Sequence, residues 1–223
     1  MTSTMKTVLV LGANGMLGSA VLRYFAARNV NRVVGSVRSP SGVRMLPVDV
    51  QSRIVTGIDV ENFDSLTQLF ATTKPDVVIN CIGLVKQLEQ VNDPLVAIPI
   101  NALLPHRLAR LSALANARLV HISTDCVFAG TKGAYTESDA SDAKDLYGRS
   151  KFLGEVDYPN AITLRTSIIG HELNSANGLI GWFLAQQGSV KGFSKAVFSG
   201  FPTVEMAEII HDVVIPRADM RGL

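Results

Sequence analysis

The stretch Thr7-Val-Leu-Val-Leu11-Gly12-Ala-Asn-Gly15-Met-Leu-Gly18 decides the fold of this 223-residue chain. An unbroken apolar run of this length is typical of a strand buried on both faces of a parallel sheet. Gly12 would let the chain turn tightly, Gly15 would let backbone approach a pyrophosphate, and Gly18 would let a helix pack against the sheet. The alternative is an ordinary glycine-rich turn. The position of the glycines at the first strand–helix junction favours a dinucleotide site. The predicted cofactor contacts are Gly12, Asn14, Gly15, Met16, Leu17 and Gly18.

The same alternation continues along the chain. Further strands are predicted at 32–37, 54–60, 76–80, 117–123 and 161–165. Amphipathic helices are predicted at 16–28, after a cap at Asn62, and at 95–116 and 145–156. This order predicts an α/β, doubly wound parallel sheet of the Rossmann type, in which ligands bind beyond the carboxyl ends of the strands. After Arg165 the pattern loosens into short helices near 179–186 and 203–214.

Composition narrows the class of protein. Hydrophobic residues make up 47% and charged residues 18%, which predicts a packed core. A net charge of +2 without a basic run argues against a nucleic-acid partner. Two cysteines cannot form a disulfide framework, and no apolar stretch approaches the roughly 18 residues of a membrane span. We therefore expect a cytoplasmic protein with no membrane partner, and the spacing of His121 and His171 predicts no metal.

The end of the second predicted strand bears on the choice of cofactor. An NAD site needs an acidic residue there for the ribose 2′-hydroxyl, but the sequence continues Gly35-Ser-Val-Arg38-Ser39. Arg38 could hold a 2′-phosphate through its planar guanidinium, which favours NADPH (NADP+). The alternative is a solvated loop arginine.

Tyr147-Gly-Arg-Ser-Lys151 places a phenol and an ammonium group four residues apart on one helical face. Reduction of a carbonyl by hydride leaves an alkoxide that needs a proton. A tyrosine with a pKa near 10 can supply it when a nearby cation lowers that pKa. We predict Thr124, Tyr147 and Lys151 as catalytic residues, with Thr124 orienting the carbonyl and Tyr147 and Lys151 also touching the cofactor. The alternative is a surface pair without function.

Several spaced motifs resemble a known family. The G-x-x-G-x-x-G spacing is similar to that of the extended short-chain dehydrogenase/reductase superfamily. Ser123-Thr-Asp-Cys-Val-Phe128, Tyr135-Thr-Glu137, Tyr147-Gly-Arg-Ser-Lys151, Leu164-Arg-Thr-Ser167 and Phe198-Ser-Gly-Phe-Pro-Thr-Val-Glu-Met-Ala207 resemble the dTDP-4-dehydrorhamnose reductase family over nearly the whole chain. The resemblance implies NADPH-dependent reduction of the 4-keto group of a nucleotide-linked 6-deoxyhexose, in the synthesis of cell-surface polysaccharide precursors. It leaves a homodimer open.

The resemblance also implies further site residues. Asp59 and Val60 would contact the adenine, and Cys81, Ile82 and Gly83 would pass under the adenosine ribose. Asn101 would support a water-linked proton path to the lysine. The implied substrate contacts are Val85, Thr124, Phe128 and Arg165. Phe128 could instead simply pack its loop.

Two boundaries and two alternative functions follow from the same resemblance. Residues 1–166 would form the NADP(H)-binding domain that carries the catalytic residues, and 167–223 a small, incomplete C-terminal substrate lobe, because family members usually continue further. One alternative is a sugar-nucleotide epimerase or dehydratase with bound NAD, for which a dehydratase would need an acidic pair near Thr124. The other is a non-catalytic module that binds NADP(H).

Overall fold

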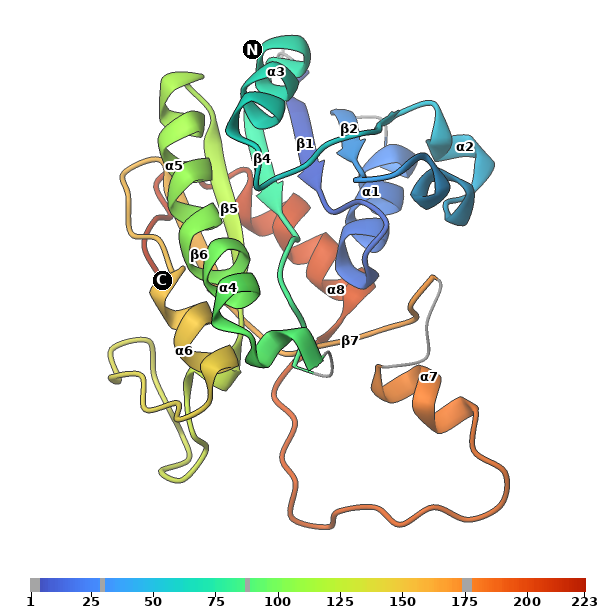
Figure 1. The fold of residues 1–223 in the computed structure, drawn as a ribbon, viewed down its shortest axis with the longest axis vertical. Coiled ribbons are helices and arrows are strands. Elements are labelled where there is room, and N and C mark those ends of the chain that lie inside the picture. Colours follow the sequence, from blue (N-terminus) through green and yellow to red (C-terminus); the bar gives the residue numbers. More distant parts are fainter. Residues whose placement is uncertain (1–4, 29–30, 87–88, 174–177) are drawn as a thin grey trace.

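The computed structural model describes residues 5–28, 31–86, 89–173 and 178–223. Its main sheet has six parallel strands in the order β3-β2-β1-β4-β5-β6 (Figure 1). The strands are β1 (Thr7–Leu11), β2 (Arg32–Ser36), β3 (Ile54–Val55), β4 (Val77–Asn80), β5 (Arg118–Ser123) and β6 (Ala161–Arg165). The predicted doubly wound α/β sheet is therefore confirmed.

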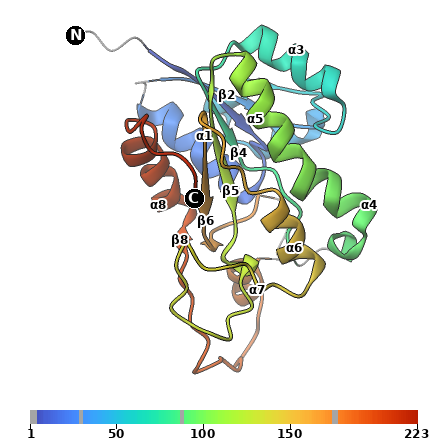
Figure 2. The ribbon, with the colours of Figure 1, turned by 90° about the vertical axis from the view of Figure 1, so that its left-hand side faces the viewer.

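Helices cover both faces of this sheet, as the turned view in Figure 2 shows. Val8 and Val10 of β1 pack in one core with α1 (Met16–Arg28) and α8 (Thr203–Glu208). Leu9 and Leu11 pack in the other core with α3 (Phe63–Thr73) and α5 (Leu104–Leu114). Alternate residues of β1 thus serve opposite cores, which is why the strand is apolar throughout.

The predicted helix at 95–116 is helical but not uniform. It consists of α4 (Pro94–Ala97), the π-helical segment η3 (Ile98–Leu103) and α5. Asp93 caps its start, since its carboxylate accepts a hydrogen bond from the Leu95 amide at 2.9 Å. A π segment widens a helix by an extra residue per turn and is frequent at functional sites. Asn101 lies within this segment.

The third strand is shorter than the predicted 54–60. It pairs with β2 only through Ile54 and Val55, opposite Gly35 and Ser36. Gly57 then adopts a φ of +78°, outside the range of a strand, so the regular ladder stops, although the Ile58 amide still donates to the Val37 carbonyl at 3.2 Å. The prediction was wrong beyond Val55.

Several short elements were not predicted from the sequence. They are η1 (Pro40–Met45), α2 (Val48–Gln51), η2 (Glu89–Asn92), η4 (Asp125–Val127), and the two-stranded parallel sheet of β7 (Ile168–Ile169) and β8 (Phe201–Pro202). The predicted helix at 145–156 appears as α6 (Leu146–Leu153), capped by Asp145, whose carboxylate accepts from the Gly148 amide at 2.7 Å.

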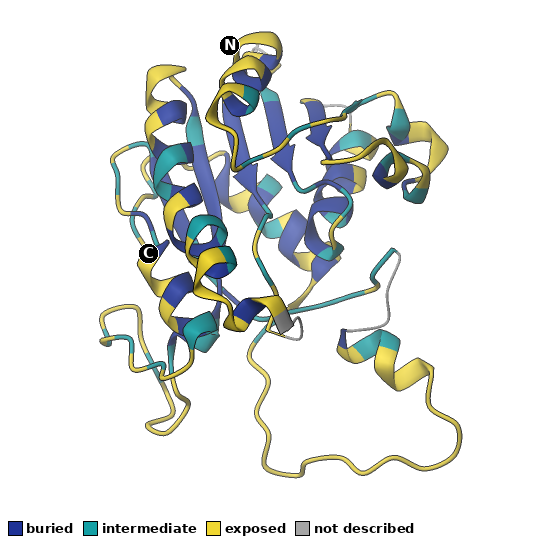
Figure 3. Ribbon diagram, in the orientation of Figure 1, coloured by how far each residue is buried: buried dark blue, intermediate teal, exposed yellow. Residues whose placement is uncertain are grey.

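The C-terminal part divides into two regions. The helix formed by α8 and η5 (Ile209–Val214) buries Met206, Ala207 and Ile210 in the core that α1 also lines. In contrast, most of α7 (Leu179–Leu184) and the loop that follows it are exposed and extend away from the sheet (Figure 3). Residues 203–214 therefore pack with the Rossmann core, and the division at residue 166 remains a prediction about substrate binding. No helix in the described part of the chain is long and apolar enough to cross a membrane.

Candidate active site

A cleft of about 560 Å³ opens at the carboxyl ends of β1, β4, β5 and β6. The predicted site residues that line it are Asn14, Gly15, Met16, Leu17, Cys81, Ile82, Gly83, Val85, Thr124, Tyr147 and Lys151. The predicted residues outside this lining are Gly12, Gly18, Arg38, Asp59, Val60, Asn101, Phe128 and Arg165. One cleft therefore brings together the glycine turn, the loop after β4 and the three predicted catalytic residues.

The glycine turn has the geometry that its sequence predicts. Gly12 takes a φ of +75°, in the left-handed region that glycine occupies without strain. A Cβ at Gly18 would overlap the carbonyl oxygen of Gly12, so only glycine lets α1 start this close to the strand. The amino end of α1 borders the cleft through Met16 and Leu17, where the helix dipole favours a phosphate.

The loop after β4 is held by hydrogen bonds to its backbone amides. Cys81 donates to the Leu11 carbonyl at 3.2 Å, Ile82 donates to Asn80 Oδ1 at 3.1 Å, and Leu84 donates to Asn101 Oδ1 at 2.9 Å. These three hydrogen bonds fix the backbone of this loop at the edge of the cleft. Burial also raises the pKa of the Cys81 thiol to about 12, so the thiol stays protonated.

Asn80 and His121 form a buried pair that the sequence analysis missed. They lie opposite each other on β4 and β5, with Asn80 Nδ2 3.1 Å from His121 Nδ1. Burial and the nearby Lys151 ammonium hold the pKa of His121 well below its usual value, so its Nδ1 accepts from the amide. The available signal was a polar residue near the end of each of two otherwise apolar strands.

The residues predicted for the adenine and the 2′-phosphate, unlike those predicted for the adenosine ribose, lie outside the cleft. Arg38 is exposed just after β2. Asp59 accepts a hydrogen bond from the Glu61 amide at 3.0 Å, and Val60 packs against the core on the α3 side. Their roles in cofactor binding remain predictions.

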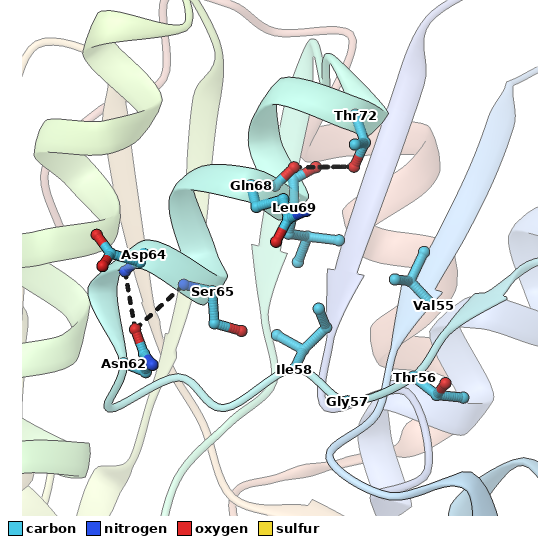
Figure 4. A pocket seen from close by; sticks show the side chains of 10 residues that line it. All are labelled: Val55, Thr56, Gly57, Ile58, Asn62, Asp64, Ser65, Gln68, Leu69 and Thr72. Carbon is cyan, nitrogen blue, oxygen red and sulfur yellow. Dashed lines mark hydrogen bonds between the residues drawn. The ribbon is translucent and has the colours of Figure 1, made fainter.

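A second pocket, of about 500 Å³, lies between the β3 edge and α3 (Figure 4). Ile58 and Leu69 supply part of its apolar lining, and none of the predicted site residues lines it. The Asn62 side chain beside it accepts from the amides of Asp64 and Ser65 at 3.0 and 3.3 Å. Asn62 is therefore the cap of α3, as the sequence predicts.

Thr124, Tyr147 and Lys151 approach the cleft from two neighbouring elements. Thr124 follows β5 and accepts a hydrogen bond from the Cys126 amide at 3.1 Å. Tyr147 and Lys151 come from α6, and Lys151 is 5% exposed. The Lys151 ammonium donates to the Ile122 carbonyl at 2.8 Å. Burial lowers the pKa of Lys151 to about 8.

The expected lowering of the Tyr147 pKa by Lys151 is not found. Burial raises the pKa of Tyr147 to about 12, and the hydrogen bond with Thr124 opposes this rise only in part. The physical reason is that the buried phenolate would lose its hydration, and the nearby acidic groups Asp125 and Asp145 disfavour its negative charge further. Tyr147 is thus held in its protonated form, and its phenol is a weaker acid here than the sequence analysis expects.

Asn101 is buried, not a surface polar residue on a regular helix. It is 1% exposed, and its Nδ2 donates to Ser150 Oγ at 3.3 Å. Together with its bond to the Leu84 amide, this contact joins the loop after β4 to α6. Its predicted part in a proton path is not tested by these contacts.

Two of the predicted substrate residues are engaged elsewhere. Phe128 stacks on Tyr135 with ring centroids 4.4 Å apart. The Arg165 guanidinium binds the Glu155 carboxylate through Nε at 2.9 Å and Nη2 at 2.7 Å. Val85 and Thr124 line the cleft, whereas Phe128 and Arg165 do not.

Polar contacts at the cleft rim add residues that sequence reasoning did not assign. Lys86 and Asp145 form an ion pair at 2.8 Å, linking the loop after β4 to the cap of α6. Ser167 Oγ donates to Asp125 Oδ1 at 2.6 Å, next to Thr124. Leu179 and Phe198 are among the apolar residues that the C-terminal part adds to the lining. Nothing in the local sequence around these residues fixes which way they point.

Comparisons with known proteins support the reading of the motifs. The family model described as the RmlD substrate binding domain matches residues 5–175. A "Probable low-salt glycan biosynthesis reductase Agl14" of Haloferax volcanii is 32% identical over 178 residues, covering 78% of this chain and 57% of that protein. Methionine adenosyltransferase 2 subunit beta of Rattus norvegicus is 30% identical over 150 residues, covering 67% of this chain and 42% of that protein. The chain spans about half the length of these relatives.

Solved structures share the fold. A hypothetical dTDP-4-dehydrorhamnose reductase from Sulfolobus tokodaii superposes with a TM-score of 0.76 at 26% identity, covering 96% of this chain and 73% of that one. The dTDP-4-dehydrorhamnose reductase of Bacillus anthracis, solved in complex with NADP, superposes with a TM-score of 0.75 at 20% identity, covering 95% and 71%. The chain belongs to the RmlD substrate binding domain family and is a dTDP-4-dehydrorhamnose reductase-like member of the extended short-chain dehydrogenase/reductase superfamily.

Proposed function

We propose that this chain is an NADPH-dependent reductase of the 4-keto group of a nucleotide-linked 6-deoxyhexose. The observation that carries the proposal is the common cleft of the glycine turn, Thr124, Tyr147 and Lys151. The NADP complex of the B. anthracis structure and the reductase names of the relatives support it.

The residues present fit a dinucleotide. Gly83 lines the cleft beside Lys151 and Asn101, where a Cβ would lie 3.5 Å from Lys151 Nζ and from Asn101 Oδ1. Gly12, Gly15 and the amino end of α1 would hold the pyrophosphate, and Arg38 the 2′-phosphate. Bound NADPH supplies the hydride for the carbonyl carbon.

Side chains of the cleft and of the π segment are assigned to proton transfer and to orientation of the carbonyl. Tyr147 donates its phenolic proton to the carbonyl oxygen as the carbon–oxygen double bond becomes a C–O–H group. Thr124 hydrogen-bonds the same oxygen and orients it. Lys151, which is buried and lines the same cleft, would hold the nicotinamide ribose hydroxyls, and Asn101 would support a water-linked proton path to Lys151.

The test begins with a titration in which NADPH is added to the protein and its binding is measured from the NADPH fluorescence. Oxidation of NADPH is then measured with a panel of dTDP- and UDP-linked 4-keto sugars. The Tyr147→Phe variant should lose turnover by a factor of at least about 100 while keeping its affinity for NADPH. Equal loss of both would show that the tyrosine is structural and would contradict the assigned role.

A second candidate is an NADP(H)-binding subunit without turnover, which the similarity to methionine adenosyltransferase 2 subunit beta supports. This candidate predicts tight NADPH binding and no oxidation of NADPH by any sugar in the panel.

An epimerase or dehydratase would instead carry bound NAD. A dehydratase also needs an acidic pair near Thr124, where Asp125 supplies one carboxylate.

A further inference from the structure

A buried ion pair lies just behind the cleft. Arg165 ends β6 and Glu155 follows α6, and their side chains are only 10% and 5% exposed. The guanidinium meets both carboxylate oxygens, with Nε at 2.9 Å from Oε1 and Nη2 at 2.7 Å from Oε2. A bidentate contact of this kind fixes the relative orientation of the two groups and offsets part of the free-energy cost of removing their charges from water.

The pair is connected to the elements that carry the site. Ser123 Oγ donates to Glu155 Oε1 at 2.8 Å, and Ser123 immediately precedes Thr124 and lines the cleft. Arg165 Nη1 donates to the Glu137 carbonyl at 3.2 Å, and the guanidinium lies 5.1 Å from the centre of the Phe128 ring. The ends of β5, α6 and β6 and the loop at 128–137 thus meet at one carboxylate and one guanidinium.

This geometry conflicts with a substrate-binding role for Arg165. An arginine that holds a diphosphate must present its donor edge to the ligand. Here the edge formed by Nε and Nη2 faces Glu155, Nη1 faces a backbone carbonyl, and neither Arg165 nor Glu155 lines the cleft.

We infer that Glu155 and Arg165 are a positioning pair, which holds the end of β5 against α6 and sets the charge around Lys151. Arg165 then acts on the reaction through Ser123 and Lys151, without contacting the substrate. The inference rests on the proposed function, because that function gives Lys151 its part in the reaction.

The surroundings of Lys151 explain how the pair can act on it. The titratable groups around this ammonium are Glu155, Cys81 of the loop after β4, His121 of β5 and Tyr147 of α6. Burial lowers the pKa of Lys151, and the Glu155 carboxylate is the larger of the two influences that raise it again. Arg165 neutralises part of that carboxylate charge. Removal of Arg165 alone should therefore raise the pKa of Lys151, and removal of both partners should lower it.

The test follows the titration of Lys151 directly by NMR of the full chain labelled with 13C-lysine, with the signal assigned through Lys151→Met. In Arg165→Met we expect the titration midpoint to rise by at least about half a pH unit. In the double variant Glu155→Gln, Arg165→Met it should fall below that of the unchanged protein. Arg165→Lys keeps the charge and should stay within about 0.3 unit. Lys132→Met, which breaks the exposed pair with Asp139, is the matched control and should shift nothing.

The kinetic arm separates positioning from substrate binding. A positioning pair predicts that Arg165→Met lowers kcat at least about tenfold and leaves KM for the sugar nucleotide within about twofold. A rise in KM with an unmoved Lys151 titration would overturn the inference and restore Arg165 as a substrate contact. If Arg165→Met does not fold, the double variant is compared with Arg165→Lys, and equal midpoints would overturn it. If no sugar nucleotide is reduced, the proposed function fails, while the NMR midpoints still decide the electrostatic role of the pair.

Discussion

The Lys151 ammonium is buried, and its lowered pKa makes the free energy of unfolding depend on pH. Its pKa is lowered from 10.5 to about 8, so above pH 8 the unfolded chain binds a proton that the folded chain releases. Stability therefore rises with pH in this range. The pKa values of Cys81 and Tyr147 are raised from 9.0 and 10.0 to about 12, which reverses the trend above about pH 9.

We predict that the free energy of unfolding increases by up to about 1 kcal/mol between pH 8 and 9. Lys151→Met should abolish this increase, because it removes the titrating group. Denaturant unfolding at pH 7, 8 and 9 measures it, with the exposed Lys144→Met as control. An unchanged increase in Lys151→Met would show that another group is responsible.

Arg38 offers a separate prediction about cofactor choice. It is exposed after β2, where no carboxylate is present to bind a ribose 2′-hydroxyl. Arg38→Ala should weaken NADPH binding at least about tenfold and leave NADH binding within about twofold, because only NADPH carries the 2′-phosphate. Fluorescence titration with both cofactors measures this, and parallel losses would remove the 2′-phosphate role. Arg44, on η1, is a nearby basic residue for a matched Arg44→Ala control.

At the scale of the elements, the strand–turn–helix unit of β1 and α1 depends on backbone contact at Gly18. A Cβ there would overlap the Gly12 carbonyl, so the turn and the start of α1 would have to move apart. Gly18→Ala should weaken NADPH binding by at least about tenfold and lower stability by about 1–3 kcal/mol. Gly192→Ala is the control, since no atom lies within 4 Å of a Cβ built there. A Gly18→Ala protein that binds NADPH normally would contradict this account of the turn.

Elements whose signal is local were predicted correctly from the sequence. The apolar run at 7–11, the glycines that follow it and the cap at Asn62 each carry their signal within a few residues. The length of β3 was predicted wrongly because the backbone of Gly57, rather than its hydrophobic neighbours, ends the strand. The π segment around Asn101 has no sequence period of its own, and it coincides with contacts from Asn101 to Leu84 and Ser150.

In the candidate site, too, residues with a local sequence signal were predicted, whereas residues placed by tertiary contacts were not. The spacing of Tyr147 and Lys151 on one helix was enough to place both at the cleft. Arg165 and Glu155 lie on separate elements, so their pairing depends on how α6 and β6 pack. The Asn80–His121 pair depends likewise on the register of β4 and β5. Tertiary contacts of this kind decide where long polar side chains point, and a sequence pattern does not carry them.

At the scale of the whole molecule, one face of the sheet is closed by a helix from the far end of the chain. α8 and η5 pack on α1, and Gly222 forms a parallel bridge with Ile162 of β6. Arg118, at the start of β5, donates to the Val214 and Met220 carbonyls, both at 2.5 Å. The chain after residue 202 therefore contributes to the stability of the sheet that carries the glycine turn.

This closure makes Ile210 a sensitive position far from the cleft. Ile210 is fully buried in the core shared by α1 and η5. Ile210→Ala should lower the free energy of unfolding by about 2–5 kcal/mol, because it removes buried methyl groups and leaves a cavity. Val204→Ala, at a position of α8 that is 53% exposed, should change it by less than about 0.5 kcal/mol. Denaturant unfolding of both variants, with NADPH titration below the transition, measures the difference. Equal stabilities would mean that α8 and η5 are not integral to the folded core, whereas loss of stability with normal NADPH affinity would show that they support the sheet without forming the site.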